Sequence, residues 1–290
     1  MLRLLAAALS ASLAGLGAGI AQSPSQWSDY VFSLPPGWTS TVYPDGLVAQ
    51  SPFYDNGERC QLTLFPPRPA SGNLANDAFT TFGELFKVDP RANSSYPFPA
   101  PVFGRGVSPQ GWPYFMVRKS IRGQVGDYGS LLSVMVVAMQ TGSSLHLIVG
   151  TSKDPMVSRC LGRVASDMWP PFFHSMRVSQ QNPAGQQPVD ARALVGTWTT
   201  ATTTLADGYT FEAGGRYSTA GRSRFGGAAA ESGSYSVRGN ALLLAGAGGN
   251  APVTTLFRLV QESTDLGRTW TESLCLLPAA GGEVCYTRER

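Results

Sequence analysis

Side chains that could perform catalysis are scarce in this sequence. It contains two histidines, His146 and His174. His146 alternates with leucines in an apolar segment and His174 follows two phenylalanines, so both are expected to be packed or surface residues rather than bases or metal ligands. The sequence contains no G-x-S-x-G, S-x-x-K, H-E-x-x-H or calcium-loop motif. We therefore expect no catalytic residue, no metal site and no cofactor, with a hydrolase as the least favoured alternative.

The four cysteines are the other reactive side chains. Cys275 and Cys285 lie symmetrically about a turn at residues 278–282, so they should face each other across a hairpin. Cys60 is expected on the core face of a strand and Cys160 on the core face of a helix, where the two can meet. We predict the disulfides Cys60–Cys160 and Cys275–Cys285. Free or metal-binding thiols are the alternative, but no two cysteines have the spacing C-x-x-C.

Residues 1–21 have the composition of a secretory signal peptide. A basic start at Arg3 precedes an apolar stretch at residues 4–19, and small residues lead to a polar break after Ala21. We expect cleavage after Ala21, with an uncleaved N-terminal anchor as the alternative. Beyond this leader, the longest apolar run covers residues 131–139, which is too short to span a membrane. The mature chain is therefore expected in the periplasm or outside the cell, without a membrane span.

The charge of the chain selects no partner. The chain has 290 residues, a formal net charge of +3 and 14% charged residues. Proteins that bind nucleic acids carry a marked basic excess, so no nucleic acid is expected as a partner. The 33 glycines and 21 prolines favour short strands and turns over long helices. The oligomeric state stays open.

A polar segment at residues 179–191 divides the chain. It contains prolines and glutamines and has no hydrophobic periodicity, as is typical of a linker. We expect a first domain at residues 22–178 and a second at residues 192–290, each long enough to bury a core of its own.

The first domain is expected to combine strands with two helices. An apolar stripe predicts a helix at residues 73–87, and an Asp-Pro start followed by a second stripe predicts another at residues 155–168. The run at residues 131–139 is apolar on both faces, so it should be a central strand covered on both sides. Further strands are predicted at residues 30–34, 40–43, 60–64, 114–121, 144–149 and 172–178.

The order of these elements resembles that of the PsbP-like α/β/α sandwich, a group that includes DcrB-type envelope proteins. Two short segments carry the resemblance, Pro-Gly-Trp at residues 36–38 and Phe-Phe-His-Ser-Met-Arg-Val at residues 172–178. The resemblance implies an α/β/α sandwich with an antiparallel sheet. Members of this group are mostly accessory or interaction modules rather than enzymes, which implies the same for the first domain.

Eight short candidate strands without a helical period fill the second domain and predict an antiparallel barrel or sandwich. Gly196 and Trp198 in the first strand, and Arg288 in the last, resemble the lipocalin-like barrels. The resemblance implies that Trp198 lies at the closed end of the barrel and that Arg288 covers it. We therefore expect an α+β protein, with an α/β/α sandwich followed by an eight-stranded antiparallel lipocalin-like β-barrel. The domain is shorter than a full lipocalin, which argues against a roomy cavity.

Strand alternation then predicts which side chains of the last two strands face the barrel interior and which face outward. If Arg288 faces the barrel interior, Cys285 faces outward, and its disulfide partner Cys275 must face outward too. The same alternation turns three residues inward: Leu274, Glu272 and Trp270.

Glu272 is the candidate for a polar anchor. A carboxylate among apolar neighbours needs a partner or a shifted pKa, so we predict that Glu272 pairs with Arg288. One interpretation is a structural ion pair at the closed end of the barrel. The other is the anchor of a ligand site that also includes Trp198, Tyr209 and Trp270.

These observations indicate an exported noncatalytic binding module of the cell envelope that holds a small apolar or amphipathic molecule in its barrel. The alternative is an interaction or assembly accessory of the envelope, in which the first domain contacts another protein and side chains fill the barrel. A cavity in the barrel would favour the first function. A packed barrel and an exposed apolar patch on the first domain would favour the second.

Overall fold

The computed structural model describes residues 25–53, 59–92, 100–108, 110–122, 131–152, 172, 175–178, 189–200, 207–220, 231–249, 251–265, 267–277 and 283–289. Several sequence-based predictions lie outside these residues: the signal peptide, the helix at residues 155–168, Cys160, His174, the turn at residues 278–282 and most of the linker. Within the described residues, no helix has the length and apolar composition that a membrane crossing requires.

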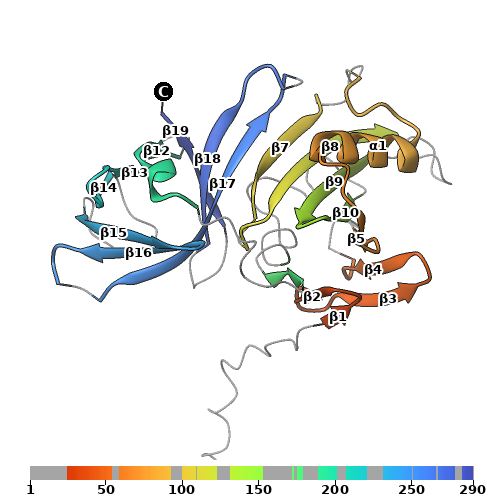
Figure 1. The fold of residues 1–290 in the computed structure, drawn as a ribbon, viewed down its shortest axis with the longest axis horizontal. Coiled ribbons are helices and arrows are strands. Elements are labelled where there is room, and N and C mark those ends of the chain that lie inside the picture. The colour runs from red at the N-terminus through yellow and green to blue at the C-terminus, as the bar shows by residue number, and fades with distance from the viewer. Residues whose placement is uncertain are drawn as a thin grey trace, which may run out of the picture.

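The second half of the chain forms a closed antiparallel barrel of eight strands, as expected (Figure 1). Each strand pairs with the next in the chain, and the last strand pairs with the first through Trp198 and Arg288. The strands are β12 (Gly196–Thr199), β13 (Gly208–Phe211), β14 (Arg216–Ala220), β15 (Ser232–Arg238), β16 (Ala241–Gly246), β17 (Val253–Ser263), β18 (Thr271–Leu277) and β19 (Val284–Arg288).

The first half is built on an antiparallel sheet with the strand order β7-β8-β9-β10-β5-β4-β3. Its central strand is apolar on both faces, as predicted, because alternate residues of β9 enter different hydrophobic clusters on the two sides of the sheet. The strands are β3 (Thr39–Tyr43), β4 (Gly46–Gln50), β5 (Cys60–Leu64), β7 (Val102–Val107), β8 (Pro113–Arg122), β9 (Leu131–Thr141) and β10 (Ser144–Ser152), with β6 (Arg68–Pro69) paired to β10.

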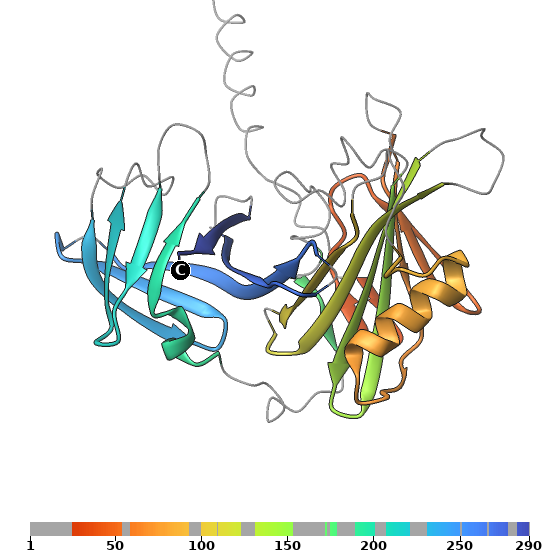
Figure 2. The same ribbon diagram turned by 90° about the horizontal axis from the view of Figure 1, so that it is seen from above.

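Helix α1 (Leu74–Phe86) covers one face of this sheet (Figure 2). The helix begins at Asn73, whose side chain accepts a hydrogen bond from the backbone of Asn76, and ends at Lys87 in the left-handed conformation. Ala78 and Phe82 on its apolar face are fully buried against the sheet. This helix confirms the stripe read from the sequence at residues 73–87.

The expected α/β/α sandwich is wrong. The described part of the first half is mostly β with one α-helix, and on the face of the sheet opposite α1 the described residues form a small second sheet and a helical turn at Phe172 and Ser175. That sheet joins β2 (Tyr30–Phe32) to β1 (Ser25–Trp27) and to β11 (Arg177–Val178). The strand predicted at residues 30–34 forms as β2, but the one predicted at residues 172–178 is shorter than expected, because Phe172 and Ser175 are helical and only Arg177–Val178 pair with β2. A periodicity of two does not say which layer a strand joins.

The two halves share a sheet. The early part of β17 pairs with β16 in the barrel, and its later part, Val260 to Ser263, pairs with β7 of the first half (Figures 1 and 2). The two strands approach closely at Gly106, where a Cβ atom would lie 2.4 Å from the carbonyl oxygen of Leu259. A backbone pairing therefore connects the barrel with the first half, in addition to the segment at residues 179–191.

Candidate functional site

Aromatic side chains pack the barrel interior. Trp198 is fully buried, and Tyr209, Phe211 and Tyr286 are nearly so. The ring centroids of Tyr209 and Tyr286 are 5.2 Å apart, and those of Phe211 and Tyr235 are 4.9 Å apart. Barrels of eight strands have interiors that side chains can fill.

At one end of the barrel, Arg288 lies over Trp198. Its guanidinium carbon is 4.4 Å from the ring centroid, and it donates a hydrogen bond to the carbonyl of Ala193. Ala193 belongs to a short 3₁₀ helix, η2 (Ala191–Leu194), and the indole of Trp198 donates to the carbonyl of Leu194 at 2.7 Å. Stacking and hydrogen bonds thus hold both side chains at this end.

Glu272 lies beside Arg288, with its Oε2 atom 2.8 Å from the Nε atom of the arginine. The two side chains are 38% and 31% exposed, so the pair lies at the rim of the barrel and not in a dry interior. The other oxygen, Oε1, accepts a hydrogen bond from Gln261 at 2.9 Å. Both carboxylate oxygens are therefore engaged by neighbouring side chains.

Trp270 does not lie beside Tyr209. It packs against the hydrophobic cluster beneath α1, where its ring centroid is 6.5 Å from that of Phe115. The reason is local: β18 begins at Thr271, so Trp270 precedes the strand and the alternation of the strand does not fix its direction. Of the predicted ligand residues, Trp198, Glu272 and Arg288 come together, and Tyr209 lies opposite Trp198 on the neighbouring strand. Trp270 instead packs against the first half.

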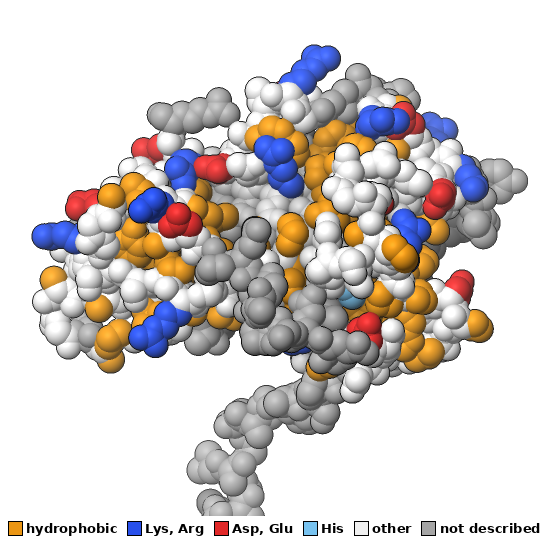
Figure 3. Space-filling view, in the orientation of Figure 1, with side chains coloured by type: hydrophobic (Ala, Val, Ile, Leu, Met, Phe, Trp, Pro, Cys, Tyr) orange, Lys and Arg blue, Asp and Glu red, His pale blue; other side chains and the backbone are white. Residues whose placement is uncertain are grey.

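The structure instead forms a pocket of about 500 Å³ where the two halves meet. Its apolar wall includes Leu74, Val107, Phe115 and Leu259, and its polar wall consists of Arg105, Gln261 and Glu272. Figure 3 shows hydrophobic and basic side chains together on the surface where the barrel meets the first half. No sequence pattern predicts this pocket, because it forms where β7 pairs with β17.

A chain of polar contacts runs along the polar wall. Arg105 donates from Nε to the side-chain oxygen of Gln261 at 2.7 Å, and Gln261 donates in turn to Glu272. The guanidinium carbon of Arg105 lies 4.2 Å from the ring centroid of Trp270. Within the part of the chain that the structure describes, the Nη atoms of Arg105 have no hydrogen-bond partner. Arg105 is exposed, so its two Nη atoms are accessible donors at the edge of the pocket.

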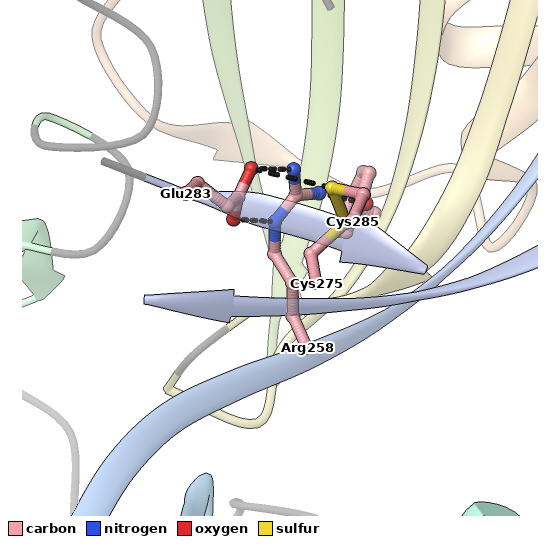
Figure 4. A network of polar contacts seen from close by, with 5 residues as sticks. Arg258, Cys275, Glu283 and Cys285 are labelled. Atoms are coloured by element: carbon pink, nitrogen blue, oxygen red, sulfur yellow. Dashed lines mark hydrogen bonds and ion pairs between the residues drawn. A yellow bond between two sulfur atoms is a disulfide. The ribbon is translucent and has the colours of Figure 1, made fainter. Parts of the chain in front are cut away.

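A second polar cluster lies on the outer face of the barrel, also at the junction (Figure 4). Arg258 donates two hydrogen bonds of 2.7 Å to the carboxylate of Glu283 and a third, of 3.1 Å, to the hydroxyl of Tyr114 in β8. Burial raises the pKa of the Tyr114 phenol. The Cys275–Cys285 disulfide lies next to this cluster and confirms the predicted pairing across β18 and β19.

The remaining reactive side chains give no catalytic arrangement among the described residues. His146 is buried, with Nε2 2.6 Å from the hydroxyl of Thr141, and burial lowers its pKa to about 4, although Asp29 opposes that shift. It is a packed core residue. His174 lies outside the described residues. Cys60 is buried and disulfide-bonded, and its predicted partner Cys160 again lies outside them.

Comparisons with known proteins assign no family. No family model and no curated protein matches the chain. Among solved structures, one from Bacteroides thetaiotaomicron is similar over 61% of this chain and 51% of its own, with 11% identity and a TM-score of 0.32. The chain thus spans about half the length of that structure.

Proposed function

We propose that this protein is an exported, noncatalytic binding protein that holds a small amphipathic molecule in the pocket between the barrel and the first half. The observation that carries the proposal is the pocket of about 500 Å³, with an apolar wall and a charged donor that has unused hydrogen bonds. Ligand sites in proteins have volumes of roughly 300 to 1,000 Å³ and combine apolar walls with a few polar groups.

The junction pocket is a better ligand site than the barrel interior. The rings of Trp198, Tyr209, Phe211 and Tyr286 occupy the barrel core and contact one another there. A ligand in the barrel would have to displace these packed rings, whereas the junction pocket already has open volume.

Binding without catalysis fits the groups that line the pocket. Glu272 is engaged by Gln261 and Arg288, so its carboxylate is not available as a general base. The guanidinium of Arg105 offers hydrogen-bond donors and no acceptor. These side chains are suited to hold a molecule in place.

Export is supported by the composition of residues 1–21 and by the Cys275–Cys285 disulfide. Disulfides persist in oxidising compartments such as the periplasm and the cell exterior. Mass spectrometry of the N-terminus of the protein from its own cells tests the expected cleavage after Ala21.

Calorimetric titration with decanoate and with decanol tests binding in the pocket. Val107→Phe places a larger side chain in the pocket, and we expect it to weaken the binding of whichever amphiphile binds by about tenfold or more. Val253→Phe is the matched control, because Val253 is exposed on β17 and does not line the pocket. Equal binding by both variants, or no binding by the unaltered protein, would contradict the proposal.

A second function is favoured by one observation on the first half. All five residues of β3 are exposed, and Val42 and Tyr43 in this strand are 62% and 49% exposed. Among the described residues β3 pairs with β4 and ends the sheet, which suits the addition of an extended segment from another envelope protein. Native mass spectrometry of the protein purified from its own envelope distinguishes the two functions. A small molecule that stays bound supports the first function. A partner protein that co-purifies with the unaltered protein but not with the Val42→Lys variant supports the second.

A further inference from the structure

Arg105 is held in one orientation by contacts on two sides of its guanidinium. The face of the group lies over the ring of Trp270, and the Nε atom donates to Gln261. Gln261 cannot reverse its amide without losing its bond to Glu272, and Glu272 is tied to Arg288. Because the face and the Nε edge are both occupied, the two Nη atoms remain as the available donors.

This arrangement gives the pocket an uncompensated positive charge. Arg105 and Glu272 are the charged residues of the described lining, and the charge of Glu272 is offset by Arg288 outside it. The only carboxylate in the wall is therefore already paired, while Arg105 has no ion pair among the described residues. A negatively charged group on the ligand would form an ion pair with Arg105.

The Nη edge of an arginine fits two oxygens of one planar group, which favours a carboxylate in a bidentate arrangement. Next to Arg105 the wall turns apolar at Val107, Phe115 and Leu259. We infer that the ligand is a small amphiphile with one carboxylate, which binds the Nη atoms of Arg105 while its apolar part lies against these side chains. The inference rests on the proposed function, since it names the ligand class of the same pocket.

The competing explanation is that Arg105 only ties the two halves together through Trp270 and Gln261. That role predicts a loss of stability upon substitution and no preference among amphiphiles. Arg91 offers a matched control, because its guanidinium carbon also lies over an aromatic ring, 5.5 Å from the centroid of Phe79, but Arg91 does not line the pocket.

The test is calorimetric titration of decanoate and decanol into the full mature protein and into two variants. We expect the unaltered protein to bind decanoate at least about tenfold more tightly than decanol. In Arg105→Gln the affinity for decanoate should fall by about tenfold, while that for decanol changes by less than about twofold. Arg91→Gln should leave both affinities unchanged.

The outcomes separate the inference from the function on which it rests. Equal affinity for the two amphiphiles overturns the inference and leaves the pocket as a site that does not select a charged ligand. An Arg105→Gln variant that keeps the preference for decanoate also overturns it, because the carboxylate would then bind to a group other than Arg105. Absence of binding of both overturns the proposed function as well. If Arg105→Gln does not fold, Arg105→Lys replaces it. Lysine keeps the charge but not the bidentate edge, so an undiminished preference for decanoate overturns the bidentate binding of the carboxylate by the Nη atoms.

Discussion

Arg258 carries its charge at a place that water scarcely reaches. Its side chain is 10% exposed and that of its partner Glu283 is 6% exposed. Burial alone would lower the pKa of Arg258, but the carboxylate of Glu283 at 2.7 Å outweighs it and holds the pKa above the ordinary value. At the scale of single residues, the carboxylate of Glu283 and a hydrogen bond to Tyr114 stabilise the buried charge of Arg258.

Glu283→Gln should therefore lower the free energy of unfolding by about 3 kcal/mol, because Arg258 would keep a buried charge without its counter-charge. Urea denaturation measures the effect. The control is Asp89→Asn, which removes an exposed ion pair with Arg91 and should change the free energy by less than about 1 kcal/mol. A similar decrease in the free energy of unfolding of the two variants would show that the buried pair of Arg258 and Glu283 contributes no more to stability than the exposed pair.

His146 makes stability depend on pH. Its pKa is about 4 in the folded protein and near 6.5 when unfolded, because burial disfavours the charged ring. The unfolded chain therefore binds a proton first, so this contribution to stability is fully present above about pH 6.5 and is lost as the pH falls toward 4. Between pH 7 and pH 5, the unaltered protein should lose about 2 kcal/mol more than His146→Gln in urea denaturation. Parallel pH curves for the two proteins would refute this role.

At the scale of elements, the contact between β7 and β17 depends on a missing side chain. A Cβ atom at Gly106 would lie 2.4 Å from a backbone oxygen of β17, which cannot move without breaking the pairing. A Cβ atom at Gly104 in the same strand would meet the terminal methyl group of Met116 at 2.8 Å, and that group can rotate away.

Gly106→Ala should therefore lower the free energy of unfolding by about 1 to 3 kcal/mol, the usual cost of forced overpacking. Gly104→Ala should cost less than about 1 kcal/mol, since a flexible side chain accommodates the added methyl group. Chemical denaturation of both variants measures the difference. An equally small loss of stability in the two variants would mean that β7 and β17 can move apart with little loss of free energy.

The β18–β19 hairpin gains stability from its cross-link. Cys275 and Cys285 are 10 residues apart, and closing a loop of this size restricts the unfolded chain by about 3 kcal/mol. The double variant Cys275→Ala, Cys285→Ala should lose about that amount, measured by urea denaturation without reductant so that the disulfide of Cys60 stays intact. A loss well below 1 kcal/mol would indicate that strand pairing alone restricts the hairpin.

At the scale of the whole molecule, β17 belongs to the barrel and to the sheet of the first half. Unfolding either half would remove hydrogen-bonded neighbours from the other, and it would also expose the Arg258 cluster to water. We therefore expect a single calorimetric transition for the mature protein, and hydrogen exchange at residues 260–263 that reports the global stability. Two separate transitions would favour the independent domains that the polar segment at residues 179–191 suggests.

For the last two strands of the barrel, the alternation of the sequence alone predicts which side chains face the interior. Alternation placed Leu274 inside and the Cys275–Cys285 pair outside, and the structure agrees, because the strand backbone imposes a period of two wherever a strand forms. The same rule brought Glu272 to Arg288. It failed at Trp270, which lies just before the strand.

Only the tertiary structure decided what lies beside those faces. Arg105 meets Gln261 because two strands far apart in the chain pair edge to edge, and the small sheet of β1, β2 and β11 covers a face where a helical layer was expected. Hydrophobic periodicity indicates whether a side chain is buried or exposed, but not which residues from other strands lie next to it. Pairing between distant strands depends on how whole layers pack, so the junction pocket has no counterpart in any one segment of the sequence.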